Sequence, residues 1–331
     1  MASELTKLIL PWKVRLLISL LSTLADTSRR SNATINRRLF NLADRQSLPN
    51  PTPVDGVSSS DVTVDPARNL WFRLFVPSSS SATTLPVFVY FHGGAFAFFS
   101  AASTPYDAVC RLYCRSLNAV VISVNYRLAP EHRYPSQYDD GFDVLKFIDR
   151  NGSVLPDVAD VTKCFLAGDS AGANLAHHVA VRVSKEKLQR TNIIGLVSVQ
   201  PYFGGEERTK SEIQLNRVPI ISVDRTDWHW KVFLPNGSDR DHEAVNVSGP
   251  NAVDISGLDY PNTIVFMGGF DPLRDWQRKY YDWLRESGKE VELVDYPNTF
   301  HAFYFFSELP ETSLFVYDVK EFMAKQMANV N

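Results

Sequence analysis

Six short apolar runs alternate with helix-length amphipathic segments from residue 85 to the end of the chain. The runs are residues 86–91, 119–124, 163–168, 193–199, 263–268 and 291–296. The segments are residues 105–116, 136–150, 172–187, 272–287 and 311–327. A strand that is buried on both faces is almost continuously apolar, and such strands alternating with helices form a parallel sheet covered on both sides. The alternation therefore predicts an α/β fold.

Other segments fall outside this rhythm. Residues 68–76 predict a further strand, residues 49–60 a Pro/Ser/Gly-rich connection, and residues 77–84 an exposed loop with four consecutive serines. Residues 202–260 are too long for a simple crossover, so we expect a helical cap over the carboxyl edge of the sheet, where α/β folds bind ligands. We expect a single domain over residues 1–331, with a separate N-terminal segment at 1–48.

The N-terminal segment has two interpretations. The run Leu16–Ala25 resembles the apolar stretch of a signal peptide, which would leave a mature chain starting near Asp26. At helical spacing the segment instead forms an amphipathic helix that lies on the protein, with a stripe of Val14, Leu17, Leu21 and Leu24. We favour the second interpretation. Lys13 and Arg15 leave about ten apolar positions where a membrane-spanning helix needs roughly twenty.

Composition and charge narrow the class of protein. Hydrophobic residues make up 44% of the chain, which argues against disorder as the main state. With 34 basic and 37 acidic residues the formal charge is −3, so no nucleic-acid partner is expected. The three cysteines (Cys110, Cys114, Cys164) predict small core residues in a reducing compartment. We expect a cytoplasmic protein, with the nucleus also open, no integral membrane association, and no metal or organic cofactor.

The pentapeptide Gly168-Asp169-Ser170-Ala171-Gly172 lies directly between an apolar run and a helical stretch. A nucleophile on a sharp strand-to-helix turn needs small residues two positions away on either side, because the backbone is crowded there. The turn exposes the serine above the strand ends, and the amide of the next residue faces the oxyanion that develops during attack. In this context the motif predicts Ser170 as a nucleophile.

A second motif, His92-Gly93-Gly94-Ala95, follows the run at 86–91. It comes before Ser170 in the chain, which is the order expected for an oxyanion loop and a nucleophile. Glycines at such a turn let backbone N–H groups face the serine oxygen and supply further oxyanion donors. We expect His92 itself to hold the loop by hydrogen bonds rather than to act as a base.

A serine hydroxyl needs a histidine to take its proton and a carboxylate to orient that histidine. Among seven histidines, His301 lies in a loop after the last predicted strand, where this chain order requires the base. Asp271 follows the run at 263–268 closely and is our candidate carboxylate, whereas Asp275 lies within the following helix and Asp295 within its strand. The remaining histidines are assigned to packing, capping, surface or cap contacts: His132, His177, His178, His229 and His242.

Several segments together resemble the plant class I carboxylesterases of the hormone-sensitive-lipase-like branch of the α/β-hydrolase fold. They are HGGAF (92–96), NYRLAPEHRYPSQYDD (125–140), GDSAGAN (168–174), FDPLRDW (270–276) and FHAFYFF (300–306). The N-terminal portion, with TINRR (34–38) and PVDGV (53–57), is especially similar to the gibberellin receptors of the same family, in which it forms a lid over the hormone. The resemblance implies Ser170, Asp271 and His301 as the catalytic triad and the amides of Gly93, Gly94 and Ala171 as the oxyanion hole.

The chain departs from the family pattern at a few positions. Ala95 stands where the third glycine of the HGGG loop is usual, and the oxyanion hole survives this change if the φ angle of Ala95 is negative. His301 is present, whereas the receptors have replaced it with an apolar residue. Thr226 and His229 stand where the receptors place a polar Arg and Tyr in the cap, and only Tyr106 and Tyr304 match the receptors' pocket tyrosines.

The sequence thus predicts an α/β-hydrolase with a mostly parallel sheet and a helical cap or lid. The expected activity is hydrolysis of small to medium, largely apolar carboxylic esters, with Ala95, Tyr106, Tyr304 and His229 lining the substrate pocket. Two alternatives use the same pocket: a hormone-binding protein like the gibberellin receptors, and a dehydratase or cyclase of the kind some relatives have become. Natural substrate, oligomeric state and protein partners are not predicted.

Overall fold

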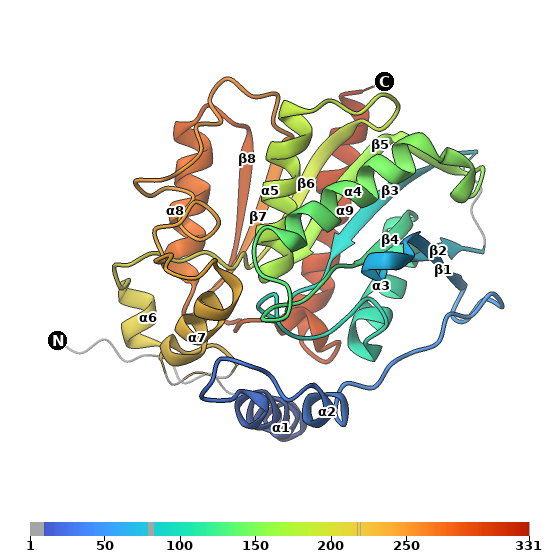
Figure 1. The fold of residues 1–331 in the computed structure, drawn as a ribbon. Helices are drawn as coiled ribbons and strands as arrows, with labels where there is room; N and C mark the ends of the chain where they lie inside the picture. Colours follow the sequence, from blue (N-terminus) through green and yellow to red (C-terminus); the bar gives the residue numbers. More distant parts are fainter. Residues whose placement is uncertain (1–9, 79–82, 217, 219, 331) are drawn as a thin grey trace.

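Eight strands form one sheet in the order β1-β2-β4-β3-β5-β6-β7-β8 (Figure 1). The computed structural model describes residues 10–78, 83–216, 218 and 220–330. The strands are β1 (Val57–Asp65), β2 (Leu70–Pro77), β3 (Leu85–Phe91), β4 (Val120–Asn125), β5 (Ala159–Asp169), β6 (Ile193–Val199), β7 (Thr263–Gly268) and β8 (Val291–Tyr296). β1 pairs with β2, and β2 with β4, in antiparallel fashion, and every other pairing is parallel.

Helices cover both faces of this sheet. One layer contains α4 (Ser136–Arg150), α5 (Ala171–Lys185) and α8 (Arg274–Glu286), and the other contains α3 (Thr104–Leu117) and α9 (Pro310–Ala328). Side chains of β3 alternate between two cores, since Val87, Val89 and Phe91 join the first and Phe88 and Tyr90 the second. All seven residues of β3 are buried, as a central strand of a doubly covered sheet requires.

The predicted α/β fold is confirmed, and each of the six apolar runs is a strand. The prediction for residues 49–60 was wrong at its end, because β1 begins at Val57 and runs antiparallel to β2 at the sheet edge. Three serines and two aspartates make the sequence of this strand resemble a loop, yet a strand at the edge of a sheet needs only part of one face buried. Residues 79–82 of the predicted serine loop lie outside the described residues.

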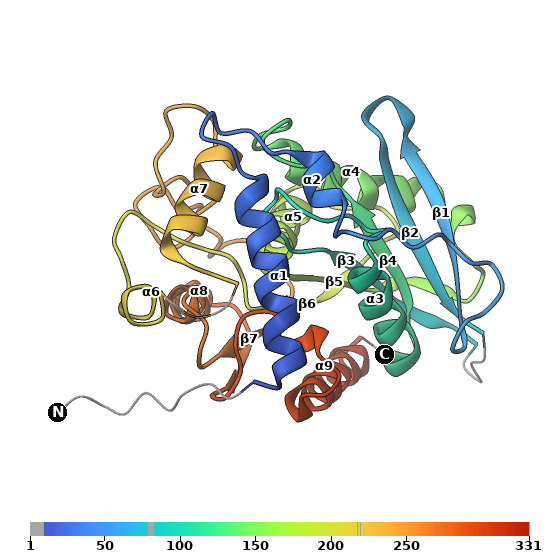
Figure 2. The ribbon, with the colours of Figure 1, turned by 90° about the horizontal axis from the view of Figure 1, so that it is seen from below.

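The N-terminal segment lies across the carboxyl ends of the strands (Figure 2). It contains α1 (Trp12–Ser28) and the short α2 (Arg37–Asn41). The helix is present as predicted, but its buried stripe differs: Val14 and Ile18 are each only 4% exposed, whereas Leu17 is 48% exposed at the pocket rim. Arg37 fastens α2 to the body by donating to the carbonyls of Ala97 and Ala129 and to Glu131.

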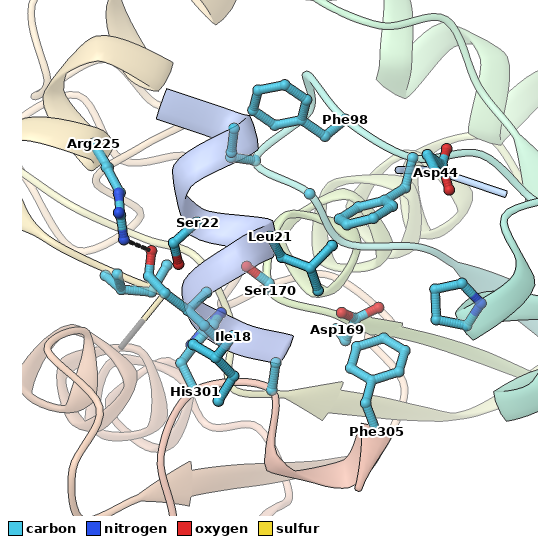
Figure 3. A pocket seen from close by; sticks show the side chains of 18 of the residues that line it. Ile18, Leu21, Ser22, Asp44, Phe98, Asp169, Ser170, Arg225, His301 and Phe305 are labelled. Carbon is cyan, nitrogen blue, oxygen red and sulfur yellow. Dashed lines mark hydrogen bonds between the residues drawn. The ribbon is translucent and has the colours of Figure 1, made fainter. Parts of the chain in front are cut away.

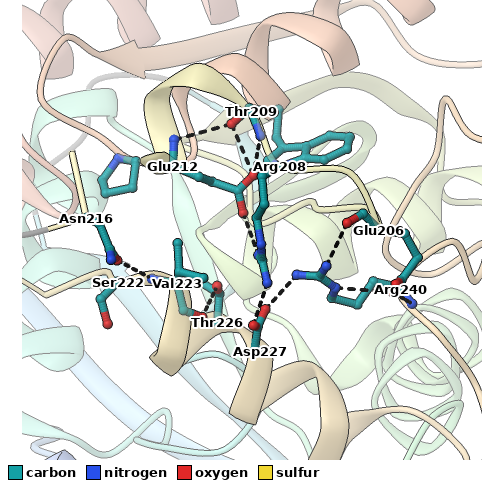
Figure 4. A network of polar contacts seen from close by, with 12 residues as sticks. Glu206, Arg208, Thr209, Glu212, Asn216, Ser222, Val223, Thr226, Asp227 and Arg240 are labelled. Carbon is teal, nitrogen blue, oxygen red and sulfur yellow. Dashed lines mark hydrogen bonds and ion pairs between the residues drawn. The ribbon is translucent and has the colours of Figure 1, made fainter. Parts of the chain in front are cut away.

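The insertion between β6 and β7 contains α6 (Lys210–Gln214), which packs against α8, and α7 (Val223–Phe233), which lies beside α1 (Figure 2). A polar network holds it together (Figure 4). Asp227 of α7 accepts hydrogen bonds from Arg208 and from Arg240, the latter at 2.6 Å, and Arg208 also pairs with Glu212 at 3.0 Å. The network fixes α7, which contributes side chains to the pocket described below. No helix of the described ranges has the length and apolar character needed to cross a membrane.

Candidate active site

A cavity of about 450 Å³ lies at the carboxyl ends of the strands, beneath α1 (Figure 3). Its wall is largely apolar, with side chains from α1, from the turn after β3, from α3, from the insertion and from the segment after β8. The residues that line it include Leu17, Ile18, Leu21, Asp26, Arg29, Asp44, Gly94, Ala95, Phe98, Tyr106, Asp169, Ser170, Arg225, Thr226, His229, His301, Tyr304 and Phe305. The cavity thus brings together segments from the whole length of the chain.

Ser170 lies at the junction of β5 and α5 in a strained backbone conformation, with φ 52° and ψ −119°. A non-glycine residue at positive φ costs of the order of 1–3 kcal/mol and persists only where the surroundings impose it. Here the amide of Ser170 donates to the carbonyl of Val199, and its own carbonyl accepts from Tyr202. A Cβ on Gly168 would lie 2.3 Å from the backbone of Gly172. The crowding predicted for the pentapeptide is therefore present.

Gly172→Ala is expected to damage the fold more than an ordinary glycine replacement. The added Cβ would lie 2.0 Å from the carbonyl oxygen of Phe91 in β3, and backbone of a central strand has little room to move. Overpacking costs about 1–3 kcal/mol, so we expect the melting temperature to fall by roughly 2–4 °C. Thermal unfolding followed by circular dichroism measures this. Gly257→Ala is the control, since nothing lies within 4 Å of its added Cβ; equal shifts for the two variants would contradict the prediction.

His301 and Asp271 form a buried pair on the other side of the cavity floor. The Nδ1 atom of His301 lies 2.7 Å from Oδ2 of Asp271, and both side chains are almost fully buried. Asp271 also accepts from Gln277 Nε2 at 2.8 Å and from the amide of Leu273 at 2.9 Å. These contacts fix the carboxylate against the imidazole and leave Nε2 of His301 for the cavity. His301 and Ser170 line the same cavity without a mutual hydrogen bond among the described residues; such bonds tighten when substrate binds.

The other buried histidines are poor candidates for a base. Burial lowers the pKa of His92 to about 4 and that of His177 to about 3. His92 stacks on Tyr126, whose hydroxyl donates to the backbone carbonyl of His92 at 2.6 Å, so the predicted structural role fits its contacts. His177 lies among Tyr260, Tyr280 and Trp283 away from the cavity.

The competing carboxylates are engaged elsewhere. Oδ2 of Asp275 accepts from the amide of Ser211 at 2.9 Å and so fastens the start of α6 to α8. Asp295 lies in β8 and forms a two-pronged ion pair with Arg274. Neither contacts His301, so of the three candidate carboxylates only Asp271 does.

The turn after β3 differs from expectation at two residues. The φ angle of Ala95 is +53°, so the negative φ on which we made the oxyanion hole depend is not found, although the N–H of Ala95 still has no partner among the described residues. Gly94 and Phe96 also have positive φ, so the chain coils left-handedly here. Each such L-residue costs roughly 1–2 kcal/mol. The amide of Gly93 donates to Oδ1 of Asp169 at 2.8 Å and is not free to meet an oxyanion. The amides of Gly94 and Ala95 donate to no partner among the described residues, and both residues line the cavity.

All four residues predicted to contact substrate line the cavity: Ala95, Tyr106, His229 and Tyr304. The hydroxyls of Tyr106 and Tyr304 are already used, because both donate to Oδ2 of Asp169, at 3.0 and 2.6 Å. His229 is held neutral, since burial and then the nearby Arg29 and Arg225 lower its pKa to about 3. Tyr106 and Tyr304 therefore offer aromatic rings to a ligand, and His229 offers a neutral imidazole.

An ion pair joins α1 to α7 at one end of the cavity. Asp26 accepts hydrogen bonds from Nε and Nη2 of Arg225 at 3.0 and 2.6 Å, and Arg29 also pairs with Asp26. Burial acts to raise the pKa of Asp26, but the two arginines more than offset it and the pKa is lowered. The pair connects segments that are 199 residues apart and fastens the N-terminal helix over the cavity.

Neither Asp169 nor the Asp26–Arg225 pair was predicted as part of the site. Asp169 occupies a variable position of the pentapeptide, and nothing local distinguishes it from a solvated turn residue. Asp26 and Arg225 have no sequence signal at all, since only the tertiary fold brings them together. Within the described part of the chain no cluster of three or more His, Cys, Asp or Glu side chains is arranged to hold a metal ion.

Comparison with known proteins identifies the family of the fold. The family model of the alpha/beta hydrolase fold matches residues 88–305. A gibberellin receptor of Arabidopsis thaliana is 40% identical over 302 residues, covering 87% of each chain, and Carboxylesterase 20 of the same plant is 36% identical, covering 78% of this chain and 83% of the relative. An α/β hydrolase from the metagenome of Lake Arreo superposes with a TM-score of 0.75 at 27% identity, over 98% of this chain and 99% of the other.

The match spans the strand–serine–helix turn, the turn after β3, Asp271 and His301. The relatives include both receptors and carboxylesterases, and the structural neighbours include an esterase of Pyrobaculum calidifontis at 26% identity and TM-score 0.75, covering 97% of this chain and 99% of the other. The chain therefore belongs to the α/β-hydrolase fold family, in the hormone-sensitive-lipase-like branch that holds both plant carboxylesterases and gibberellin receptors.

Proposed function

We propose that this protein is a carboxylesterase that works through an acyl-enzyme formed on Ser170. One observation carries the proposal: the buried pair of His301 and Asp271, 2.7 Å apart, faces the same cavity as a serine held at positive φ. A binding protein has no need of an oriented imidazole beside a strained serine, whereas acyl transfer requires both.

The chemistry follows from the contacts. Asp271 accepts from Nδ1 of His301 and so places the unprotonated Nε2 toward Ser170, which loses its proton as Oγ attacks the ester carbonyl. The oxyanion of the tetrahedral intermediate is held by the amides of Gly94, Ala95 and Ala171. The amide of Ala171 is free of the helix because it opens α5. The imidazolium then protonates the leaving alkoxide, and water activated by His301 releases the acid.

The cavity selects the class of ester. Its volume of about 450 Å³ and its apolar wall suit a small to medium acyl or alcohol group without charge. Phe98, Phe305 and Ile18 form part of this wall (Figure 3).

Turnover of p-nitrophenyl esters with acyl chains from C2 to C12 tests the proposal. We expect saturable hydrolysis with an optimum at short to medium chains and loss of activity after treatment with a fluorophosphonate that labels Ser170. Absence of turnover above the rate in buffer, or labelling at another residue, would overturn it.

A receptor-like function is the second candidate, because relatives named as gibberellin receptors match this chain at 35–40% identity and α1 covers the cavity as a lid would. It predicts tight binding of a small hormone without chemical change. Titration calorimetry with a gibberellin, followed by recovery of the ligand for mass spectrometry, separates the two functions. Heat of binding with unaltered ligand and no ester turnover would favour the receptor.

The covering helix should control affinity for long acyl chains. Ile18→Ala removes apolar wall from α1 above the cavity, and each lost CH₂ contact is worth up to ~0.8 kcal/mol. We expect the KM for a C8 ester to rise about 5- to 10-fold, with little change in kcat for a C2 ester.

Leu20→Ala is the matched control, since Leu20 is on the same helix but is 53% exposed and does not line the cavity. Steady-state kinetics over the chain-length series measures both variants. A chain-length profile of Ile18→Ala that coincides with that of Leu20→Ala would show that α1 does not cover the acyl group.

A further inference from the structure

The carboxylate of Asp169 is buried beside the proposed nucleophile and has a complete set of donors. Oδ1 accepts from the hydroxyl of Tyr90 at 2.6 Å and from the amide of Gly93 at 2.8 Å. Oδ2 accepts from the hydroxyls of Tyr106 and Tyr304 at 3.0 and 2.6 Å. No ion pair with Asp169 occurs in the described ranges. Since all four partners donate, the arrangement suits the ionised carboxylate, which only accepts.

The four donors come from four different parts of the site. Tyr90 is in β3, Gly93 in the turn that follows it, Tyr106 in α3, and Tyr304 in the short 3-10 helix Phe303–Phe305. Tyr304 lies three residues after His301 along the chain. The side chain of Asp169 thus connects the proposed oxyanion turn to the loop that carries His301. Asp169 is also the residue directly before Ser170 in the chain.

The turn is fitted to this carboxylate. A Cβ on Gly93 would lie 2.4 Å from Oδ2 of Asp169 and 2.9 Å from the hydroxyl oxygen of Tyr106. Only glycine lets the backbone approach so closely. With the Gly93 amide bound to Asp169, the next two amides, of Gly94 and Ala95, remain for the cavity.

The three hydroxyls also have an electrostatic task. Burial raises the pKa of Asp169, and hydrogen bonds from Tyr304, Tyr90, Tyr106 and Gly93 act against that rise. A buried carboxylate without donors would repel the negative charge that develops on the substrate oxygen, because no water screens the two charges from each other there. Hydroxyl dipoles aimed at the carboxylate reduce this repulsion.

We propose that Asp169, held by the hydroxyls of Tyr90, Tyr106 and Tyr304, is the positioning residue that sets the oxyanion turn and keeps it in register with the loop of His301. The proposal rests on the esterase function proposed above and adds to it. It assigns no contact between Asp169 and substrate. Its effect reaches the reaction through the amides of Gly94 and Ala95.

Tyr304→Phe and Tyr106→Phe each remove one donor and keep the ring that lines the cavity. We expect kcat for p-nitrophenyl acetate to fall about 10- to 100-fold in each variant, below the loss for a direct oxyanion donor, with KM within about twofold of the wild type. Tyr280→Phe is the control: its hydroxyl is also buried, but it contacts His177 and Tyr260 outside the cavity. We expect unchanged kinetics for this variant.

Inhibitor binding separates positioning from a merely structural role. Oγ of Ser170 adds to the carbonyl carbon of an alkyl trifluoromethyl ketone and gives its proton to His301, so that the carbonyl oxygen becomes an oxyanion. The matching methyl ketone binds without this addition in appreciable amount. The Ki of the fluorinated ketone is expected to rise by the same factor as kcat/KM falls, while the Ki of the methyl ketone stays unchanged.

The outcomes distinguish this proposal from the one on which it rests. Wild-type protein without turnover overturns both. Wild-type turnover together with an unchanged ratio of the two Ki values in Tyr304→Phe and Tyr106→Phe overturns the role of Asp169 alone. This second outcome includes the case in which both Ki values rise equally. If the melting temperature also falls, the hydrogen bonds to Asp169 serve stability only.

Discussion

Ser170→Ala is expected to lower kcat for every ester by at least about a thousandfold and to leave the melting temperature nearly unchanged. The hydroxyl of Ser170 has no hydrogen-bond partner among the described residues, so its removal breaks no contact of the folded state. The backbone strain at φ 52° stays the same in alanine. Binding is also retained, because the wall of the cavity is untouched.

Single-turnover kinetics with p-nitrophenyl acetate and titration with a non-hydrolysable ester analogue measure the two parts of this expectation. Ser198→Ala is a matched control, because Ser198 is a fully buried serine of β6 whose hydroxyl also lacks a partner. Residual activity of Ser170→Ala within tenfold of the wild type would mean that another residue is the nucleophile.

Most of the sheet could be predicted because a central parallel strand leaves a distinct pattern. β3 and residues 164–169 of β5 are buried on both faces, so their apolar runs are hardly interrupted. β1 could not be found this way. Ser59 is buried beside Asn50 and Arg111, which satisfy its hydroxyl, and such a polar strand has no apolar period to detect.

The helix over the cavity shows where periodicity stops being informative. Residues 16–21 read LLISLL, so several overlapping stripes exist and the sequence does not choose among them. Tertiary contacts choose: Ile18 packs inward, whereas Leu20 faces outward and Leu17 lies at the rim. Our predicted stripe therefore included Leu17 and omitted Ile18.

Chain order predicted the placement of Ser170, Asp271 and His301 because each follows a strand whose carboxyl end reaches one edge of the sheet. The role of Asp169 could not be predicted in this way. Its donors, Tyr90 and Tyr304 among them, look like ordinary core aromatics in the sequence, and only the folded chain aims their hydroxyls at one carboxylate. Hydrogen bonds that support a catalytic residue from distant segments have no fixed spacing in the sequence.

Asp271→Asn is expected to lower kcat/KM by about three to four orders of magnitude at neutral pH. In the unsubstituted protein, the carboxylate of Asp271 accepts hydrogen bonds from Nδ1 of His301 at 2.7 Å, from Gln277 and from the amide of Leu273. Asparagine keeps the shape, but its one carbonyl oxygen can satisfy only part of this set. Where its amide group faces Nδ1, the histidine must turn its proton toward Ser170, which is the wrong tautomer for a base.

Asp275→Asn provides the contrast, four residues away on the same segment. Its carboxylate accepts from the amide of Ser211 and touches neither His301 nor Ser170, so we expect a small loss of stability and activity within a few-fold of the wild type. Steady-state kinetics from pH 6 to 9 and thermal unfolding of both variants measure the difference. Comparable losses of activity at Asp275 and Asp271 would show that the wrong carboxylate has been assigned. A loss at Asp271 alone, at unchanged melting temperature, ties the activity to the orientation and charge of one imidazole.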